Sequence, residues 1–195
     1  LFAALDEMVA EGVMRHYGVS VEKVEQAQKA MAYPGLATVQ IIFNMVRQRP
    51  ADGFLAQAKA ADVGVLARVP LASGLLTGKY DAASTFAEND HRNFNRYGAS
   101  FDVGETFAGL DYEAGLEFVA GLQELVPDGA TTAQTALRWI LMHEGVTAAI
   151  PGAKNPEQAR ANAAAADLPP LSDEVMAGVR DLYERLAKPL VHQRW

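Results

Sequence analysis

Hydrophobic and polar residues alternate along this chain with two different spacings. In residues 1–12, apolar side chains fall at positions 1, 2, 5, 8 and 9, the three- and four-residue spacing of one helix face. Residues 36–46 instead form a near-continuous apolar run, which is typical of a strand buried on both faces. The same patterns predict strands near 13–19, 37–43, 63–69 and 146–150 and helices at 1–12, 21–31, 52–61, 112–126, 131–144, 155–166 and 172–186.

The predicted order is one helix followed by four strand–helix units, which implies a parallel sheet covered by helices. Two architectures contain such a sheet: an open doubly wound fold and the second half of a (β/α)8 barrel. An open sheet that binds dinucleotides carries Gly-x-Gly-x-x-Gly after its first strand, and YGVSVEK at 17–23 lacks this motif. Four strands cannot close a barrel that takes about 250 residues. The barrel interpretation therefore predicts that about half of the barrel is absent from this chain.

Composition limits the kinds of partner to expect. The chain has 17 Lys and Arg against 24 Asp and Glu, and a net charge of −7 argues against nucleic acid or an anionic membrane. It has no cysteine, which excludes disulfides and thiolate metal sites, and its four scattered histidines argue against a metal centre. No apolar stretch is long enough to span a bilayer, and the acidic start is unlike a signal peptide. We expect a cytoplasmic protein whose natural N-terminus is not Leu1, because Leu1 is not an initiator methionine.

Residues 70–111 form a long segment without a persistent period, rich in Gly, Asn, Asp, Ser and Thr. A loop of that length inside a compact domain is usually functional or disordered. The segment begins within RVPLASGLLTGKY at 68–80, whose Gly-Lys pair near its end suggests a nucleotide triphosphate loop. That motif requires Gly where Ser73 stands and Ser or Thr where Tyr80 stands. The match therefore fails at both ends.

Five segments in order carry a family resemblance: ALDEMVAEGVMRHYGVS (4–20), VQIIFN (39–44), GVLARVPLASGLLTGKY (64–80), TAQTALRWIL (132–141) and IPGAKNPEQARAN (150–162). Through them the chain resembles the C-terminal half of the aldo-keto reductases, nicotinamide-dependent enzymes built on a (β/α)8 TIM barrel. It looks most similar to the bacterial, general-stress-protein-like branch. The resemblance covers essentially the whole chain. It implies that 1–195 is one domain, the cofactor-binding half of a larger barrel whose N-terminal half is absent from this chain.

The resemblance assigns the glycine-containing turn at 70–79 to the cofactor pyrophosphate. Small residues allow close approach of the backbone to an anion, and a lysine supplies a mobile positive charge. On local sequence alone, an ordinary turn with a solvated lysine is the better explanation of the segment, and only the other motifs favour a phosphate site. The residues that the resemblance places against the phosphates are Pro70, Leu71, Ala72, Ser73, Gly74, Leu75 and Lys79.

A second anion site is expected where Asn155-Pro156 begins a helix, because free N–H groups and the helix dipole favour negative charge there. The resemblance implies that the turn at Gly152 and the side chain of Lys154 contact the 2′-phosphate of NADP(H), and that Gln158 and Asn162 contact adenine. Ala161 stands where the family often has a glutamate. The alternative is a capped surface helix.

The resemblance assigns Ser20 and Gln40 to the nicotinamide carboxamide. The residue after the serine is often Asn or Arg in the family and is Val21 here. Ser20 is equally well explained as a helix N-cap. Gln40 in an apolar strand needs a hydrogen-bond partner if it is buried, and a backbone group would satisfy it as well as a ligand.

The family's catalytic Asp, Tyr, Lys and His come from the first half of the barrel, so no catalytic residue is assigned to this chain. The resemblance implies an NADPH-dependent reductase of aldehydes or ketones when the protein is full length, and an inactive half when this chain is alone. Its expected partners are a small carbonyl substrate and either the missing N-terminal half or a self-association partner. Two alternatives remain: a non-catalytic NADP-binding regulatory or sensor relative, and a half-barrel that dimerises.

Overall fold

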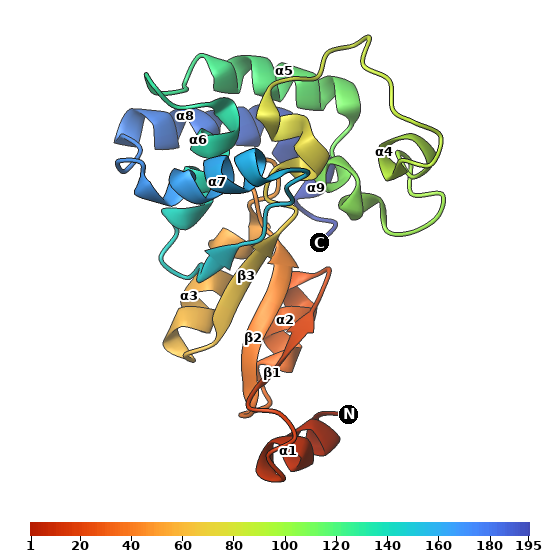
Figure 1. Cartoon of the computed structure of the whole chain (residues 1–195), viewed down its shortest axis with the longest axis vertical. Coiled ribbons are helices and arrows are strands. Elements are labelled where there is room, and N and C mark those ends of the chain that lie inside the picture. Colours follow the sequence, from red (N-terminus) through yellow and green to blue (C-terminus); the bar gives the residue numbers. More distant parts are fainter.

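A sheet of four parallel strands organises the chain in the computed structural model, which describes residues 1–195 (Figure 1). The strands are β1 (Tyr17–Ser20), β2 (Leu36–Ile42), β3 (Gly64–Arg68) and β4 (Ala148–Ala149). Their order across the sheet is their order along the chain, and each neighbouring pair is parallel. Each connection must therefore run from the carboxyl end of one strand back to the amino end of the next, and helices form these connections. The prediction of a parallel half-barrel is confirmed, and β1 and β4 are its open edges.

The strand boundaries differ from the predicted ones where the sheet, and not hydrophobicity, sets them. β1 begins at Tyr17, which pairs with Leu36, the first residue of β2. Residues 13–16 were predicted to be strand, but they have no neighbouring strand to pair with. The predicted strand at 146–150 is reduced to the two residues of β4. β2 and β3 differ from 37–43 and 63–69 by one residue at each end.

Helices form at all seven predicted places. Asp111, Thr131 and Ser172 cap α5, α6 and α8 by accepting hydrogen bonds from backbone N–H groups of the first turn. The predicted helix at 172–186 is α-helical to Leu182 and continues as a π-turn to Ala187. None of the helices combines the length and apolar character required to cross a membrane. The helices are α1 (Phe2–Ala10), α2 (Val24–Ala30), α3 (Phe54–Ala60), α4 (His91–Phe94), α5 (Tyr112–Gln123), α6 (Thr132–Leu141), α7 (Pro156–Ala164), α8 (Asp173–Leu182) and α9 (Lys188–Val191).

The two faces of the sheet have different surroundings. Val39 and Val65 project from one face and are 0% exposed, because α2 and α3 pack against that face. Gln40 and Leu66, the next residues along the same strands, project from the other face and remain half-buried. Figure 1 shows α5 to α9 gathered beyond the carboxyl ends of the strands and α1 at the opposite end. Helices α5 to α9 therefore cover the carboxyl edge of the sheet, while the second sheet face stays open.

The segment at 70–111 contains short turns of helix where the sequence pattern predicts only a loop. A 3₁₀ turn spans Ala72–Thr77, α4 makes one turn, and two further 3₁₀ turns cover Val103–Glu105 and Phe107–Gly109. No element in it is long enough to produce a readable period. Its ends return to the carboxyl edge of the sheet, which is where the predicted site residues lie.

Candidate functional site

The sheet brings the two predicted carboxamide ligands side by side. Ser20, the last residue of β1, pairs in register with Gln40 of β2, so both side chains leave the open face of the sheet. Ser20 is exposed and Gln40 is half-buried, and neither side chain hydrogen-bonds to another protein group. The N-cap of α2 is Lys23, so the interpretation of Ser20 as a helix cap is wrong. The pair is free to bind an amide.

The predicted phosphate loop has an unusual backbone. Val69, Ala72 and Ser73 adopt φ values of 51°, 47° and 57°, and Gly74 has a φ of 89°. Left-handed backbone costs a non-glycine residue of the order of 1–2 kcal/mol. Such strain persists only where surrounding structure enforces it, and it concentrates at functional sites. Here the side-chain amide of Asn44 contributes by donating a 2.8 Å hydrogen bond to the carbonyl of Val69.

Ser73 is held by a segment far along the chain. Its hydroxyl donates to the carbonyl of Glu105 at 3.2 Å and accepts from the N–H of Phe107 at 3.1 Å. The hydroxyl donor that a phosphate would need is therefore engaged by the protein. Among the other predicted contacts, Pro70, Ala72 and Leu75 are buried, while Leu71 and Gly74 are half-buried. Phosphate contact at this loop stays a prediction, and it would rely on the backbone of the half-buried residues.

Two cationic side chains flank the predicted phosphate loop at 70–79. Lys79 is exposed, pairs with no carboxylate, and places its Nζ 5.3 Å from the ring centroid of Tyr80. Arg92, on α4, donates to the carbonyl of Ser73 at 3.3 Å and to the hydroxyl of Tyr80. Asp90 holds the Arg92 guanidinium through bonds of 2.5 and 2.8 Å. The sequence alone did not assign Arg92 a role, because its segment has no period by which it could be aligned.

The turn before α7 is built by the residues predicted to bind adenosine. Asn155 caps the helix by accepting from the N–H of Gln158 at 2.8 Å. The side chain of Gln158 accepts from the N–H of Lys154 at 2.8 Å, and Asn162 donates to the carbonyl of Gly152 at 3.1 Å. The two amides therefore shape the turn in this structure. Lys154 is exposed without a carboxylate partner, so its charge is available to an anion.

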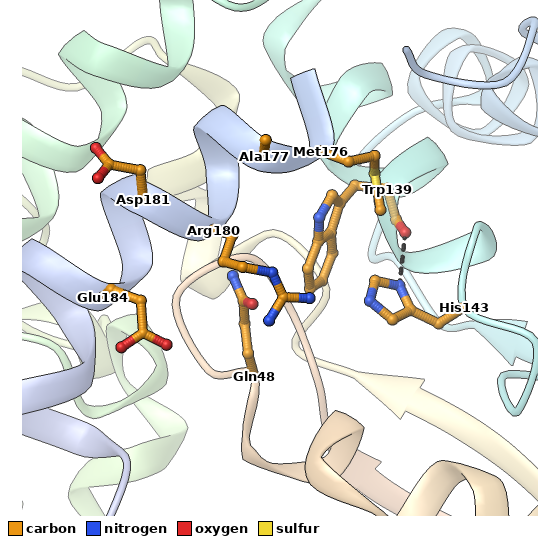
Figure 2. A pocket seen from close by; sticks show the side chains of 8 residues that line it. All are labelled: Gln48, Trp139, His143, Met176, Ala177, Arg180, Asp181 and Glu184. Carbon is orange, nitrogen blue, oxygen red and sulfur yellow. Dashed lines mark hydrogen bonds between the residues drawn. The ribbon is translucent and has the colours of Figure 1, made fainter. Parts of the chain in front are cut away.

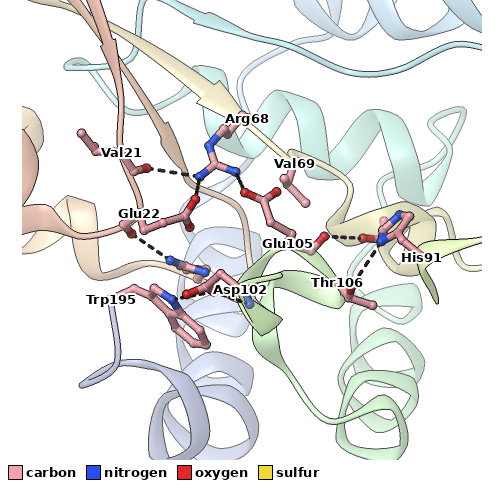
Figure 3. A network of polar contacts seen from close by, with 12 residues as sticks. Val21, Glu22, Arg68, Val69, His91, Asp102, Glu105, Thr106 and Trp195 are labelled. Atoms are coloured by element: carbon pink, nitrogen blue, oxygen red, sulfur yellow. Dashed lines mark hydrogen bonds and ion pairs between the residues drawn. The ribbon is translucent and has the colours of Figure 1, made fainter. Parts of the chain in front are cut away.

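A network of charged side chains, which sequence analysis missed, lies at the carboxyl ends of β1 and β3 (Figure 3). Arg68, the last residue of β3, forms ion pairs with Glu22 and Glu105 and donates to the carbonyl of Val21 at 3.2 Å. The network therefore ties the end of β1 and the end of β3 to the segment that holds Ser73. These residues come from three separate parts of the chain, and no local pattern marks them as a group.

Arg47 and Trp195 extend this network. Arg47 is 3% exposed, donates to the carbonyl of Glu22 at 2.9 Å, and lies 4.0 Å from the ring centroid of Trp195. Burial lowers the pKa of the Arg47 guanidinium to about 10. The indole N–H of Trp195 donates to Asp102 at 3.0 Å. Trp195 is thus part of the structure that covers the carboxyl edge of the sheet.

Three polar atoms in this network are buried without a partner: Glu22 Oε2, Arg47 Nη1 and Arg68 Nε. Burial raises the pKa of the Glu22 carboxyl, Arg68 opposes this shift, and the neighbouring carboxyl group of Glu105 adds to it. The chain has no other buried side-chain N or O atom without a partner. Unsatisfied buried groups concentrated at one place are typical of a functional site.

A separate cavity of about 470 Å³ opens between α6 and α8 (Figure 2). His143, Trp139 and Arg180 line it, and the ring of His143 bonds to the carbonyl of Trp139 at 2.9 Å. Burial lowers the pKa of His143, which keeps the ring neutral at physiological pH. None of the predicted site residues reaches this cavity.

The residues at the carboxyl edge fit a nicotinamide dinucleotide. The unbonded Ser20–Gln40 pair offers donors and an acceptor for an amide. Lys79 and Lys154 are unpaired cations at two separate turns, and each can neutralise a phosphate group. The half-buried backbone between Leu71 and Gly74 can approach a ligand closely.

Comparison with known proteins agrees with this fit. A model of the aldo/keto reductase family matches residues 1–184. The chain is 30% identical over 190 residues to aldo-keto reductase str7 of Strobilurus tenacellus, covering 95% of this chain and 54% of that protein. It is 24% identical over 184 residues to the NADP(+) aldo-keto reductase yakc of Schizosaccharomyces pombe, covering 93% and 52%.

Solved structures show the same relationship. The glycerol dehydrogenase AKR11B4 of Gluconobacter oxydans superposes with a TM-score of 0.74 at 27% identity, covering 93% of this chain and 53% of that one. The chain spans about half the length of the curated relatives that it matches. Its parallel half-barrel, the residues at its carboxyl edge and these matches lead to one conclusion: the chain belongs to the aldo/keto reductase family.

Proposed function

We propose that this chain is the cofactor-binding half of an NADPH-dependent reductase that converts aldehydes or ketones to alcohols. The observation that carries the proposal is the carboxyl edge, where the free Ser20–Gln40 pair and the unpaired Lys79 and Lys154 lie on a family-matched half-barrel. The NADP(+) in the name of the fission yeast relative supports the choice of cofactor.

In this proposal the chain binds and orients the cofactor. Ser20 and Gln40 hold the carboxamide and so fix which face of the ring meets the substrate. The backbone near Ser73 and the ammonium of Lys79 hold the pyrophosphate, and Lys154 holds the 2′-phosphate. The nicotinamide, when bound, supplies the hydride. The proton donor lies outside this chain, in the half of the barrel that holds the family's first four strands.

The proposed partner for the open face of the sheet is that other half. Gln40 and Leu66 are half-buried on this face, and β1 and β4 expose unpaired edges. Exposed strand edges and apolar faces favour association. A second half-sheet would pair both edges and enclose the open face as the barrel interior.

The test is an assay of the complete gene product that contains this chain. Loss of NADPH absorbance should depend on an added aldehyde or ketone, and this chain expressed alone should show no turnover. Binding of NADPH without turnover of any carbonyl would favour the non-catalytic regulatory alternative. Failure to bind NADPH or NADH would contradict the proposal itself.

A further inference from the structure

A group of charged side chains, built around the buried Arg47, lies one layer beyond the Ser20–Gln40 pair. Gln40 pairs in register with Leu66, and Arg68 follows Leu66 by two residues, so its side chain leaves the same face of the sheet. At about 3.3 Å per residue, this layer begins about 7 Å beyond the pair. We call the group the edge cluster, and its members are Glu22, Arg47, Arg68, Asp102 and Glu105 (Figure 3).

The edge cluster contains more negative than positive groups. Its two guanidinium groups and three carboxylates give a net charge of −1 when all are ionised. Arg47 is 3% exposed and the Arg68 side chain is 12% exposed, while the Glu22 and Glu105 side chains are each 31% exposed and Asp102 is exposed. Water therefore screens Asp102 well and the two glutamates only in part. Two further cations lie nearby: Arg49 is paired with Glu25 and donates to the Trp195 carbonyl, and the Arg194 guanidinium lies 4.6 Å from the Trp195 ring centroid. Neither forms an ion pair with a carboxylate of the cluster.

Part of the negative charge is incompletely neutralised by the protein. Glu22 pairs with Arg68 through Oε1, but its buried Oε2 accepts no hydrogen bond. The unpartnered Nη1 of Arg47 belongs to a guanidinium that stacks on Trp195. The carboxylate of Glu22 follows Ser20 by two residues. It is therefore the charged group of the cluster closest in sequence to the carboxamide site.

We propose that the edge cluster favours the oxidised, cationic nicotinamide ring over the reduced, neutral ring, so that Glu22 and Glu105 set the relative affinity for NADP+ and NADPH. This inference rests on the proposed function. The two forms of the cofactor have almost the same shape, but the oxidised ring carries one more positive charge. A fixed negative charge in the next layer of side chains distinguishes them by Coulomb attraction without a direct contact. By stabilising the oxidised form, the cluster makes bound NADPH a better hydride donor.

The test compares the dissociation constants of NADP+ and NADPH by calorimetric titration of the complete gene product. The variant is Glu22→Gln, which keeps the shape of the side chain and its Oε1 acceptor. At about pH 8.5, well above the usual pKa of a glutamate, we expect about fivefold weaker NADP+ binding and less than about twofold change for NADPH. Glu117→Gln removes the same charge from the exposed face of α5 and should change neither.

Glu105→Gln serves as the second variant and should shift the ratio of the two affinities in the same direction. Because protonation of Glu22 removes the excess charge, the preference of the wild type for NADP+ should also fall as pH decreases through the raised pKa of Glu22. Equal weakening of both cofactors by both variants would overturn the inference and leave a structural role. A wild type that binds neither cofactor would overturn the proposed function, and the inference with it.

Discussion

At the scale of single residues, Trp195 packs tightly against the chain segments that cover the carboxyl edge of the sheet. A side-chain Cβ placed on Gly109 would lie 2.3 Å from the ring of Trp195, and one on Gly104 would lie 3.0 Å from it. The ring therefore fits only because two glycines stand beneath it. Its indole N–H bond to Asp102 then fixes its orientation.

We predict that Gly109→Ala destabilises the protein more than Gly129→Ala. Both glycines have a φ of 81°, so each substitution carries a backbone cost of about 1–2 kcal/mol. Only at Gly109 must the Trp195 ring also move, since a Cβ at Gly129 meets open space; such overpacking adds about 1–3 kcal/mol. Urea unfolding of the two variants measures the difference. Equal free energies of unfolding would show that Trp195 is not seated on Gly109.

At the scale of elements, the sequence was most informative where one element buries one face. Apolar runs predicted all four strands and the seven longer helices, because burial and period leave a local signal. Strand ends were predicted less well, since Tyr17 starts β1 only because Leu36 is its partner across the sheet. A pairing partner is not visible in a local pattern.

The candidate site was predictable in part for the same reason. Ser20, Gln40 and Lys154 lie in segments whose order and amino-acid sequences carry the family resemblance. The ion pairs of Arg68 with Glu22 and Glu105 join residues 46 and 37 positions apart, so no spacing reveals them. The hydroxyl bonds of Ser73 to the 105–107 segment were likewise hidden.

We predict that the Asp90–Arg92 ion pair anchors the 80–111 segment. Arg92 holds the pKa of the Asp90 carboxyl well below its usual range, mainly through side-chain hydrogen bonds. Asp90→Asn should cost about 1 kcal/mol at neutral pH, the upper range for a partly exposed pair. Because the folded pKa is depressed, this stability is present above about pH 4 and is lost as pH falls below it.

Denaturant unfolding of wild type and Asp90→Asn over this pH range measures the effect. The difference between them should shrink as the solution is acidified. Asp128→Asn, at an exposed carboxyl that forms no ion pair or side-chain hydrogen bond, is the matched control and should change stability little. A difference between Asp90→Asn and wild type that does not change with pH would contradict an electrostatic anchor.

At the scale of the whole molecule, the open sheet face determines how this chain behaves alone. We expect the isolated chain to associate with concentration, because two strand edges and a half-buried apolar face are uncovered. Leu66→Lys places a charge on that face and should reduce the association. Sedimentation velocity over a range of concentrations measures it. A monodisperse, thermally stable monomer would contradict the proposal that another half covers this face.

The central claim is that the carboxyl edge binds a nicotinamide dinucleotide with Lys154 on its 2′-phosphate, and cofactor titration of the complete gene product tests it most directly. A charged hydrogen bond of about 1.5–3 kcal/mol corresponds to a preference for NADPH over NADH on the order of ten- to a hundredfold. Lys154→Ala should remove most of that preference, and Lys79→Ala should weaken the binding of both cofactors together. Lys29→Ala, at an exposed position of α2, should change the affinity for neither cofactor. Equal weakening of NADH and NADPH by Lys154→Ala would contradict the account.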